Sequence, residues 1–387
     1  MEEKTTSEIL EELNRSSGKK HGGLILVGLL AVARYLTLNK NLSGFTWDEK
    51  TEENLHLDSL GFELTLLGDI YKIWNKPYIR KGVPSNKPVK VIPGVKEVTR
   101  DNNFCDMSVY PKKLVAYFCN KWGEVTDKEQ IAKIYRDLIK LENKIYDKEE
   151  NILSESVEAL GTELLNISDE DALYVVGTNI NMLRPTPAYV TCCVNYNLEW
   201  QWIWRTLEYL SGKKPQILFT DILGNIVDNN NNGENVTFDK VLLQVTPEMT
   251  VRTDVIQSEG ILSAASSTKS SKHNLDEIAY ALHMLEDTGK AVVILDTDAL
   301  YDGKNISEQC KEMLLKPGYA EAVISLPDNQ SILLLSKAEG NRMLSIDGTR
   351  LVTEESGEMD LSMQDVKRIV DIVREKKIIA GISKYED

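Results

Sequence analysis

Apolar residues recur at helical spacing through the first 150 residues of the chain. In segments such as 24–38 and 128–148 they return every three or four positions, which places them on one face of a helix. Prolines at positions 77, 84, 88 and 93 interrupt this pattern and predict a loop over 76–98. The expected helices are 7–14, 24–38, 57–75, 112–121 and 128–148. We therefore expect a helical N-terminal domain.

From about residue 170 the pattern changes to short β-branched runs that alternate with amphipathic segments. This alternation is typical of a parallel sheet covered by helices, so the second half is expected to have an α/β fold. The expected strands are 172–176, 189–194, 216–220, 240–245, 291–295, 321–325 and 331–337. Only residues 326–330 separate the last two strands. This is too short for a helical crossover, so the two strands are expected to pair antiparallel.

Three amphipathic segments of the second half are expected to be helical. Asn274 is the expected N-cap of the second helix, and Gly289 is its expected C-terminal stop. The third helix is expected to pack on its own domain rather than on a partner. The helices are 200–210, 275–287 and 361–377. The expected domains are a helical domain (1–150), an α/β domain (151–350) and a C-terminal helix with its tail (351–387).

The charge of the chain limits its direct contact with nucleic acid. The formal net charge is −15 and the pI is about 5.0. Because non-specific binding to nucleic acid is mostly electrostatic, a broad basic surface is not expected. Any DNA contact is expected to lie in a local cleft or to be supplied by a partner.

The cysteines and histidines do not form a metal-binding pattern. The five cysteines include no Cys-x-x-Cys pair, which favours reduced thiols in a cytoplasmic protein. Cys192 and Cys193 are interpreted as small apolar residues of a buried segment. The four histidines make no His-x-x-x-His spacing, so no metal site is expected. The acidic N-terminus lacks the layout of a secretory signal, and the apolar run 23–36 is too short to span a bilayer.

Two blocks in the second half carry a resemblance to a known family. The first is Gly289-Lys290, an apolar strand and then Leu300-Tyr301; the second is Glu321-Ala322-Val323-Ile324-Ser325-Leu326-Pro327. Their order and spacing resemble those of the modification subunit of type I restriction-modification systems, an adenine-specific DNA methyltransferase family. The resemblance covers about residues 170–375. It implies a seven-stranded, Rossmann-like sheet of the S-adenosylmethionine-dependent methyltransferases, preceded by a helical domain.

The cofactor turn of that family is altered in this chain. Family members end their first strand in Asp-Pro-x-x-Gly-x-Gly, because S-adenosylmethionine approaches the backbone too closely for side chains at the glycines. The matching stretch 174–183 has Asn179 and Asn181 at the two glycine positions. Asn tolerates positive φ, so the turn is expected to survive while the pocket above it is altered. A rival register places the turn at 146–153, which also lacks its glycines.

The resemblance also assigns two polar residues to the cofactor. Asn195 stands where the family has the acid that accepts hydrogen bonds from the ribose, and a neutral amide accepts more weakly than a carboxylate. Asp221 matches the acid that lies near the adenine. Both residues also fit an interpretation as ordinary strand-end residues, and these alternatives stay open. If S-adenosylmethionine binds, the resemblance assigns its contacts to Gly177, Thr178, Asn179, Asn195 and Asp221.

The catalytic tetrad of the family, Asn-Pro-Pro-aromatic, is replaced here by Gln244-Val245-Thr246-Pro247. In active members the first side chain and a backbone carbonyl accept hydrogen bonds from the flipped base, and the aromatic ring stacks on it. Gln244 carries its side-chain carbonyl one methylene further out, and Pro247 cannot stack as an aromatic ring does. Positioning errors of about 1 Å cost on the order of a hundredfold in rate. The sequence therefore predicts a degenerate tetrad without an intact catalytic residue.

Two other segments suggest contacts with nucleic acid but favour structural interpretations. Trp200, Trp202, Trp204 and Tyr209 have the spacing of a helix packed beside a sheet, which favours a core position over base stacking. Segment 263–273 is rich in Ser and Lys but lacks the glycines of a phosphate-binding loop, which favours a flexible linker.

The sequence thus indicates a methyltransferase-like protein without efficient catalysis, which acts as a binding or assembly subunit. The expected partner is a specificity subunit or an active paralogue. One alternative is a divergent adenine DNA methyltransferase in which Gln244 and Asp221 suffice. Another is a protein whose pocket binds a nucleotide other than S-adenosylmethionine above Gly177.

Overall fold

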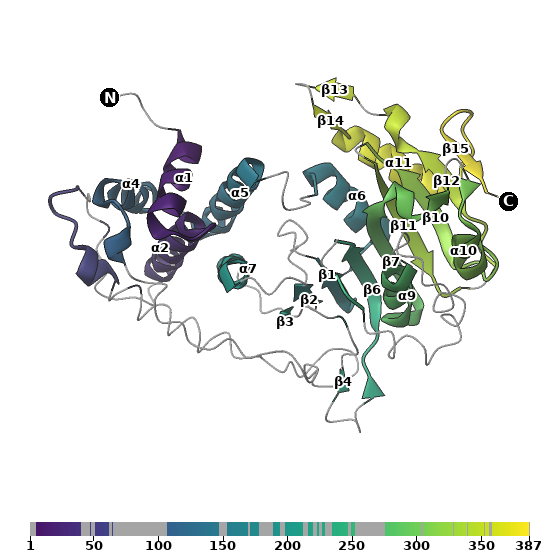
Figure 1. Cartoon of the computed structure of the whole chain (residues 1–387), viewed down its shortest axis with the longest axis horizontal. Coiled ribbons are helices and arrows are strands. Elements are labelled where there is room, and N and C mark those ends of the chain that lie inside the picture. Colours follow the sequence, from purple (N-terminus) through teal and green to yellow (C-terminus); the bar gives the residue numbers. More distant parts are fainter. Residues whose placement is uncertain are drawn as a thin grey trace. The chain divides into compact units, whose positions relative to one another are not determined.

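The computed structural model divides the chain into two compact units. The helical unit comprises residues 1–78, 96–152 and 197–214, and the sheet unit comprises 79–95, 153–196 and 215–387 (Figure 1). The two units interleave along the sequence. The residues that the structure describes are 5–39, 47, 51–61, 64, 107–146, 153–168, 171–177, 189–193, 198–211, 216–219, 223, 227–228, 234–246, 249–251, 275–302, 305–327, 329–338, 340–351, 353–355 and 358–386.

The helical unit is built around one apolar helix, α2. Thirteen of its seventeen residues are buried, and it contacts each of the other long helices of the unit. These helices are α1 (Thr6–Ser17), α2 (Gly22–Leu38), α4 (Lys112–Gly123), α5 (Lys128–Tyr146) and α7 (Leu198–Leu210). The helices expected at 7–14, 24–38, 112–121 and 128–148 are confirmed. Of the helix expected at 57–75, residues 57–61 and 64 are helical, and the rest, like the loop 76–98, lies outside the described residues.

Local signals fix the start and the end of α1. Thr5 and Glu8 form a capping box at its start, and Gly18 ends it with a left-handed φ of 65°. The chain then bends by 106° into α2. Within the described part of the chain, no single helix is long and apolar enough to cross a membrane, although α1 and α2 together pass that test by length and composition.

A buried polar network joins the helices of this unit. Glu142 of α5 is fully buried; one of its carboxylate oxygens accepts a hydrogen bond from the Asn14 side chain, and the other lies 3.1 Å from Nδ1 of His21. The Asn14 side-chain oxygen accepts a hydrogen bond from the Gly23 amide at 2.6 Å. The His21 amide donates to the Glu199 carboxylate of α7 at 2.7 Å. Four helices are therefore joined through polar atoms inside an apolar bundle.

Helix α7 belongs to the helical unit, although it lies between two strands of the sheet in the sequence. It packs on α2 and α5, and Trp204 is fully buried. The prediction that Trp204 is a core residue is confirmed, but the core is that of the helical unit. The expected place beside a sheet was wrong because periodicity shows that a helix buries one face and does not show against which element.

The sheet unit contains a nine-stranded mixed sheet in the order β15-β12-β10-β11-β7-β6-β1-β2-β3. All seven expected strands are confirmed, and β12 and β15 extend the sheet beyond them. The expected antiparallel pairing of β10 with β11 is confirmed as well. The strands are β1 (Leu173–Val176), β2 (Tyr189–Cys193), β3 (Gln216–Phe219), β6 (Phe238–Gln244), β7 (Leu285–Asp296), β10 (Ala320–Ser325), β11 (Gln330–Ser336), β12 (Leu344–Asp347) and β15 (Ser383–Tyr385).

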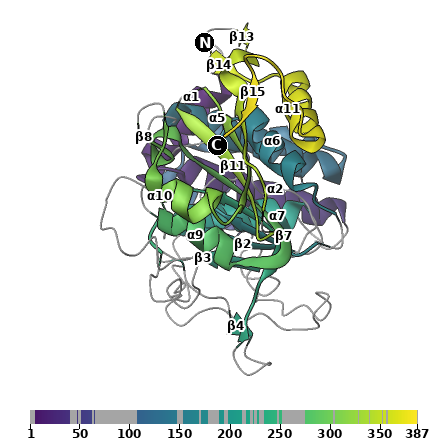
Figure 2. The ribbon, with the colours of Figure 1, turned by 90° about the vertical axis from the view of Figure 1, so that its right-hand side faces the viewer.

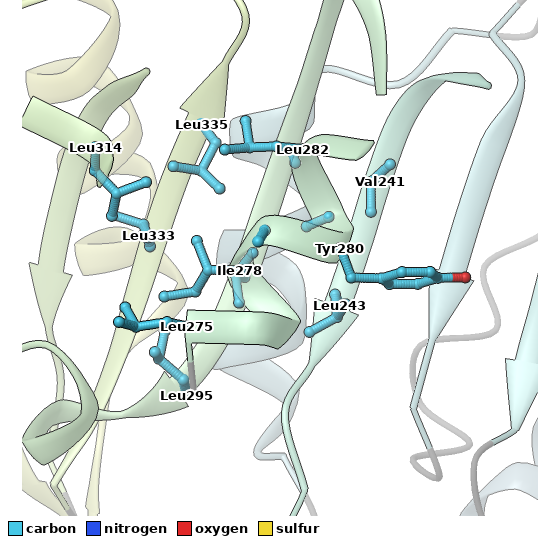
Figure 3. Close-up of a cluster of buried hydrophobic side chains, with 14 of the residues drawn as sticks. Val241, Leu243, Leu275, Ile278, Tyr280, Leu282, Leu295, Leu314, Leu333 and Leu335 are labelled. Atoms are coloured by element: carbon cyan, nitrogen blue, oxygen red, sulfur yellow. The ribbon is translucent and has the colours of Figure 1, made fainter. Parts of the chain in front are cut away.

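Helices cover both faces of this sheet. Gly161 of α6 (Glu155–Leu165) packs on the side chains of Leu242, Val292 and Ile294, which point to one face. The alternate residues of the same strands join the core on the side of α9 (Leu275–His283), which Figure 3 shows. Helix α11 (Met363–Glu375) packs on α6 (Figure 2) and buries Val366, Ile369, Val370 and Ile372. The prediction that this helix packs on its own domain is confirmed.

The expected end of the helix at 275–287 is corrected by the structure. Helix α9 ends at His283, β7 begins at Leu285, and Gly289 lies inside that strand. A Cβ at Gly289 would lie 2.8 Å from the Asp239 carbonyl oxygen and 2.7 Å from the Leu285 side chain. Gly289 therefore permits close packing where the β6–β7 register shifts, and it is not a helix stop.

Short elements complete the sheet unit. Two antiparallel strand pairs, β8 with β9 and β13 with β14, lie among the later strands, and a third, β4 with β5, precedes β6. The short elements of the chain, including η2 of the helical unit, are η2 (Met107–Val109), β4 (Val227–Asp228), β5 (Glu234–Asn235), η6 (Thr297–Ala299), β8 (Tyr301–Asp302), β9 (Asn305–Ile306), α10 (Glu308–Cys310), the π-helix η7 (Lys311–Leu315), η8 (Gly348–Leu351), β13 (Thr353–Glu355) and β14 (Glu358–Asp360).

Candidate functional site

The candidate site lies at the carboxyl edge of the parallel strands. Strands β3, β2, β1 and β6 are neighbours and run in the same direction, so they end at one edge of the sheet. Val176, the last residue of β1, pairs with Leu243 of β6 and with Cys192 of β2. In open α/β sheets, ligands bind outside this edge. The fold therefore brings together the strands that precede the predicted cofactor residues and the tetrad.

The first strand places Gly177 at this edge, next to Gln244. Both residues follow the paired residues Val176 and Leu243 directly. Gly177 has a φ of 156°, a backbone conformation that L side chains rarely adopt. Thr178, Asn179, Asn181, Asn195, Asp221 and Pro247 lie outside the described residues. The rival register at 146–153 is not supported, because Tyr146 is the last residue of α5 and not of a strand.

The tetrad positions continue the strand. The backbone amide of Val245 donates to the Ile294 carbonyl of β7 at 2.8 Å, so the β6–β7 ladder extends one residue beyond Gln244. The carbonyl of Thr246 accepts from the Met249 amide at 3.0 Å. Gln244 is only 3% exposed and Thr246 only 4%. A proline at position 245 would have no amide hydrogen to donate to Ile294. The family's tetrad has a proline at this position, so this backbone hydrogen bond could not form there.

A cluster of three aromatic side chains supports β1 and β6 behind this edge. The rings of Tyr174 and Phe238 are stacked with their centres 4.9 Å apart. The hydroxyl groups of Tyr174 and Tyr280 lie 2.8 Å apart, and both side chains are fully buried. These contacts join the two strands to α9. They make Tyr174 part of the core, and the strand before Gly177 is held by side-chain contacts with two other elements, β6 and α9.

The structure adds an acidic pair that the sequence pattern did not single out. Leu275, the first residue of α9, lies beside Leu295 near the end of β7 (Figure 3), so Asp276 and Glu277 follow at this end of the strand. Burial raises the pKa of Glu277 to about 7; its own backbone hydrogen bond opposes the shift, and Asp276 adds to it. Burial also raises the pKa of Asp276. Acidic residues are common in the first turn of helices, so the sequence alone did not indicate that Asp276 and Glu277 are buried.

Glu277 is expected to make the stability of the sheet unit depend on pH. Because its folded pKa of about 7 lies above the ordinary value of 4.5, the protonated carboxyl stabilises the fold. This stability is fully present below pH 4.5 and is lost as the pH rises through 7. We expect the free energy of unfolding to fall between pH 5 and 8, and we expect this fall to be smaller in Glu277→Gln than in wild type by on the order of 2 kcal/mol. Urea unfolding followed by circular dichroism measures it. The exposed Asp371→Asn is the control, and equal losses in Glu277→Gln and wild type would contradict the assignment.

The described residues do not suggest a metal site. Among them, no group of three His, Cys, Asp or Glu residues is placed to hold a metal ion. Cys119 and Cys310 are buried cysteines outside any disulfide, while Cys192 and Cys193 lie in β2. Segment 263–273 lies outside the described residues, so the linker interpretation stays a prediction.

Comparison with known proteins shows which family model and which solved structures this chain is similar to. Residues 220–387 match the family model of N-6 DNA methylases. The structure is similar to the methyltransferase subunit of the type I restriction-modification system from Streptococcus thermophilus, with a TM-score of 0.65 and 14% identity over 98% of this chain and 93% of that chain. It is also similar to a modification subunit of a putative type I restriction enzyme from Vibrio vulnificus, with a TM-score of 0.50 and 10% identity over 100% of this chain and 93% of that chain. No curated protein matches the chain.

Proposed function

We propose that this chain is a methyltransferase-like subunit without efficient catalysis. Its match to the N-6 DNA methylase model and its structural similarity to a type I methyltransferase subunit support this proposal. The chain acts in binding or assembly. The likeness to the solved structures supports the fold, and the match over residues 220–387 supports the link to methylases. The inactive role rests on the tetrad and on the cofactor turn.

The observation that carries this proposal is the continued ladder at Val245. A working tetrad presents a side-chain acceptor and a free backbone carbonyl to the flipped base. Here Val245 is tied to Ile294 through its amide, and Gln244 is almost completely buried. The segment is therefore built as part of the sheet, and Pro247 supplies no aromatic ring for stacking. These features support the loss of methyl transfer.

The cofactor side supports a weakened site. S-adenosylmethionine would supply an activated methyl group if it binds. Gly177 fits a close approach of this cofactor, since it has no Cβ and a positive φ. Asn195 and Asp221 would hold its ribose and adenine. Asn179 and Asn181, in contrast, add side chains where the family has glycines. We therefore infer weak binding of the cofactor or none.

Isothermal titration of the full chain with S-adenosylmethionine tests this function. We expect no binding at micromolar concentration and no transfer of labelled methyl groups to DNA, because turn and tetrad are both altered. A competent type I methyltransferase subunit, assayed in the same buffer, is the positive control. Micromolar binding would overturn the strong form of the proposal, and labelled DNA would overturn the loss of catalysis.

A divergent adenine methyltransferase is the second candidate. It is favoured by the retained conformation of Gly177 beside Gln244 at the carboxyl edge. In that case labelled transfer to nucleic acid would be seen and would be abolished by Gln244→Ala. The other open alternative is a different nucleotide above Gly177, and thermal-shift measurements with a nucleotide series would identify it.

The assembly role implies a protein partner. We infer that the partner is a specificity subunit or an active paralogue. DNA is then contacted through that partner or through a local cleft, and the protein acts in the cytoplasm. The net charge of −15 supports this division, since the chain as a whole repels phosphates. Size-exclusion chromatography with light scattering, with an active modification subunit added, would detect the complex.

A further inference from the structure

One face of α4 combines an exposed lysine, a half-buried lysine and an exposed aromatic ring. Lys113, Tyr117 and Lys121 follow one another at four-residue intervals and so form one row along the helix, which we call the α4 stripe. The Tyr117 side chain is 38% exposed. Lys121 Nζ lies 5.7 Å from the centre of the Tyr117 ring. Val109, which is 42% exposed, precedes the row at the same spacing.

The core does not account for the position of this ring. Helix α4 buries its other face through Leu114, Val115, Phe118 and Trp122. Tyr117 contacts Phe118 edge-on, with the ring centres 5.1 Å apart, and this contact helps to fix the orientation of the Tyr117 ring. The α4 stripe therefore presents a partly exposed ring outside the face that α4 buries.

The charge around the stripe is opposite to that of the chain. Residues 107–123 include three lysines and no Asp or Glu, whereas the whole chain has 60 acidic and 45 basic residues. Asp106 and Glu124 border this segment directly. A local excess of positive charge favours an anionic partner, and a nucleic-acid strand carries a negative charge at every phosphate.

The exposed ring distinguishes between polyanions. Bases in a duplex are covered by their neighbours, whereas an unpaired base stacks on an aromatic side chain. Lys113 and Lys121 are separated by about 12 Å along the helix axis, which is on the order of two to four phosphates of one strand. We propose that the α4 stripe binds single-stranded nucleic acid, with Tyr117 stacked on a base and the lysines on phosphates. This site is separate from the carboxyl edge and needs no methyl transfer.

Fluorescence anisotropy with the full chain and a short labelled oligothymidylate tests this site. Tyr117→Ala is expected to weaken binding about tenfold, because a stacked base is lost, while Tyr117→Phe keeps the ring and the affinity. The double variant Lys113→Glu and Lys121→Glu is expected to weaken binding and to reduce its dependence on salt. Circular dichroism shows whether each variant is folded.

The matched control changes the same charge elsewhere in the helical unit. Lys128 and Lys133 are exposed on α5, where Glu129 and Asp137 are interspersed. Lys128→Glu with Lys133→Glu is expected to leave the affinity within about twofold. The proposal is overturned if this control weakens binding as much as the stripe variant, if Tyr117→Ala binds like wild type, or if a duplex of equal length binds as tightly as the single strand.

Discussion

Glu142→Ala is expected to lower the free energy of unfolding of the helical unit by about 3–5 kcal/mol. The Glu142 carboxylate is fully buried and contacts both the Asn14 amide and the His21 ring. Its removal leaves polar groups of two other helices without this partner inside the bundle. The five tryptophans at described positions (47, 122, 200, 202 and 204) all belong to the helical unit, so urea unfolding followed by tryptophan fluorescence reports on this unit.

Two other variants separate the buried contacts from the helix itself. Glu129→Ala removes an exposed carboxylate from the first turn of the same helix, and its effect is expected to stay within about 0.5 kcal/mol. Glu142→Gln keeps an acceptor for Asn14 but removes the charge, so its loss is expected to be intermediate. A Glu142→Ala protein as stable as Glu129→Ala would show that the polar network contributes nothing to the stability of the bundle.

Gly318→Ala is expected to destabilise the sheet unit by about 2–5 kcal/mol. Gly318 lies between the π-helix η7 and strand β10 and has a φ of 78°. An L residue pays roughly 1–2 kcal/mol for this left-handed conformation. A Cβ here would also lie 2.5 Å from the Gly340 amide nitrogen and 2.7 Å from that of Asn341, and this overlap adds roughly 1–3 kcal/mol. Hydrogen exchange of β10 and β11 amides is the measurement.

Gly340 provides a matched control for that substitution. Its φ is 83°, close to that of Gly318, but a Cβ there would have no atom within 4 Å. Gly340→Ala is therefore expected to pay only the conformational cost of about 1–2 kcal/mol. Equal losses in the two variants would mean that the loop containing Gly340 and Asn341 moves away without cost.

The strands of the sheet were predictable because each is a short β-branched run between turn residues. The antiparallel pairing of β10 and β11 followed from the five residues between them, since chain length limits the connection. The edge strands β12 and β15 were missed because Leu344–Asp347 alternates apolar and polar residues and Ser383–Tyr385 is mostly polar, so neither has a continuous apolar run like that of β1. The end of α9 was misplaced since helical periodicity continues past His283 while the backbone already pairs with β6.

For the candidate site, residue types alone predict that Gln244-Val245-Thr246-Pro247 lacks an intact tetrad, and this stays a prediction. The amide of Val245 bonded to Ile294, and the burial of Gln244, depend on where β7 lies, which no local pattern specifies. The raised pKa of Glu277 has the same origin, since desolvation depends on neighbours distant in sequence.

The place of α7 in the chain has a consequence for the order of folding. The contact between His21 and Glu199 spans 178 residues, and two strands of the sheet precede α7 in the sequence. During synthesis, α2 is therefore complete long before the helix that covers part of it. A fragment that ends near residue 150 would leave this apolar helix open on the side where Gly28 faces Thr206. The helical unit is not a separable N-terminal piece, and its last helix arrives only after the sheet has begun.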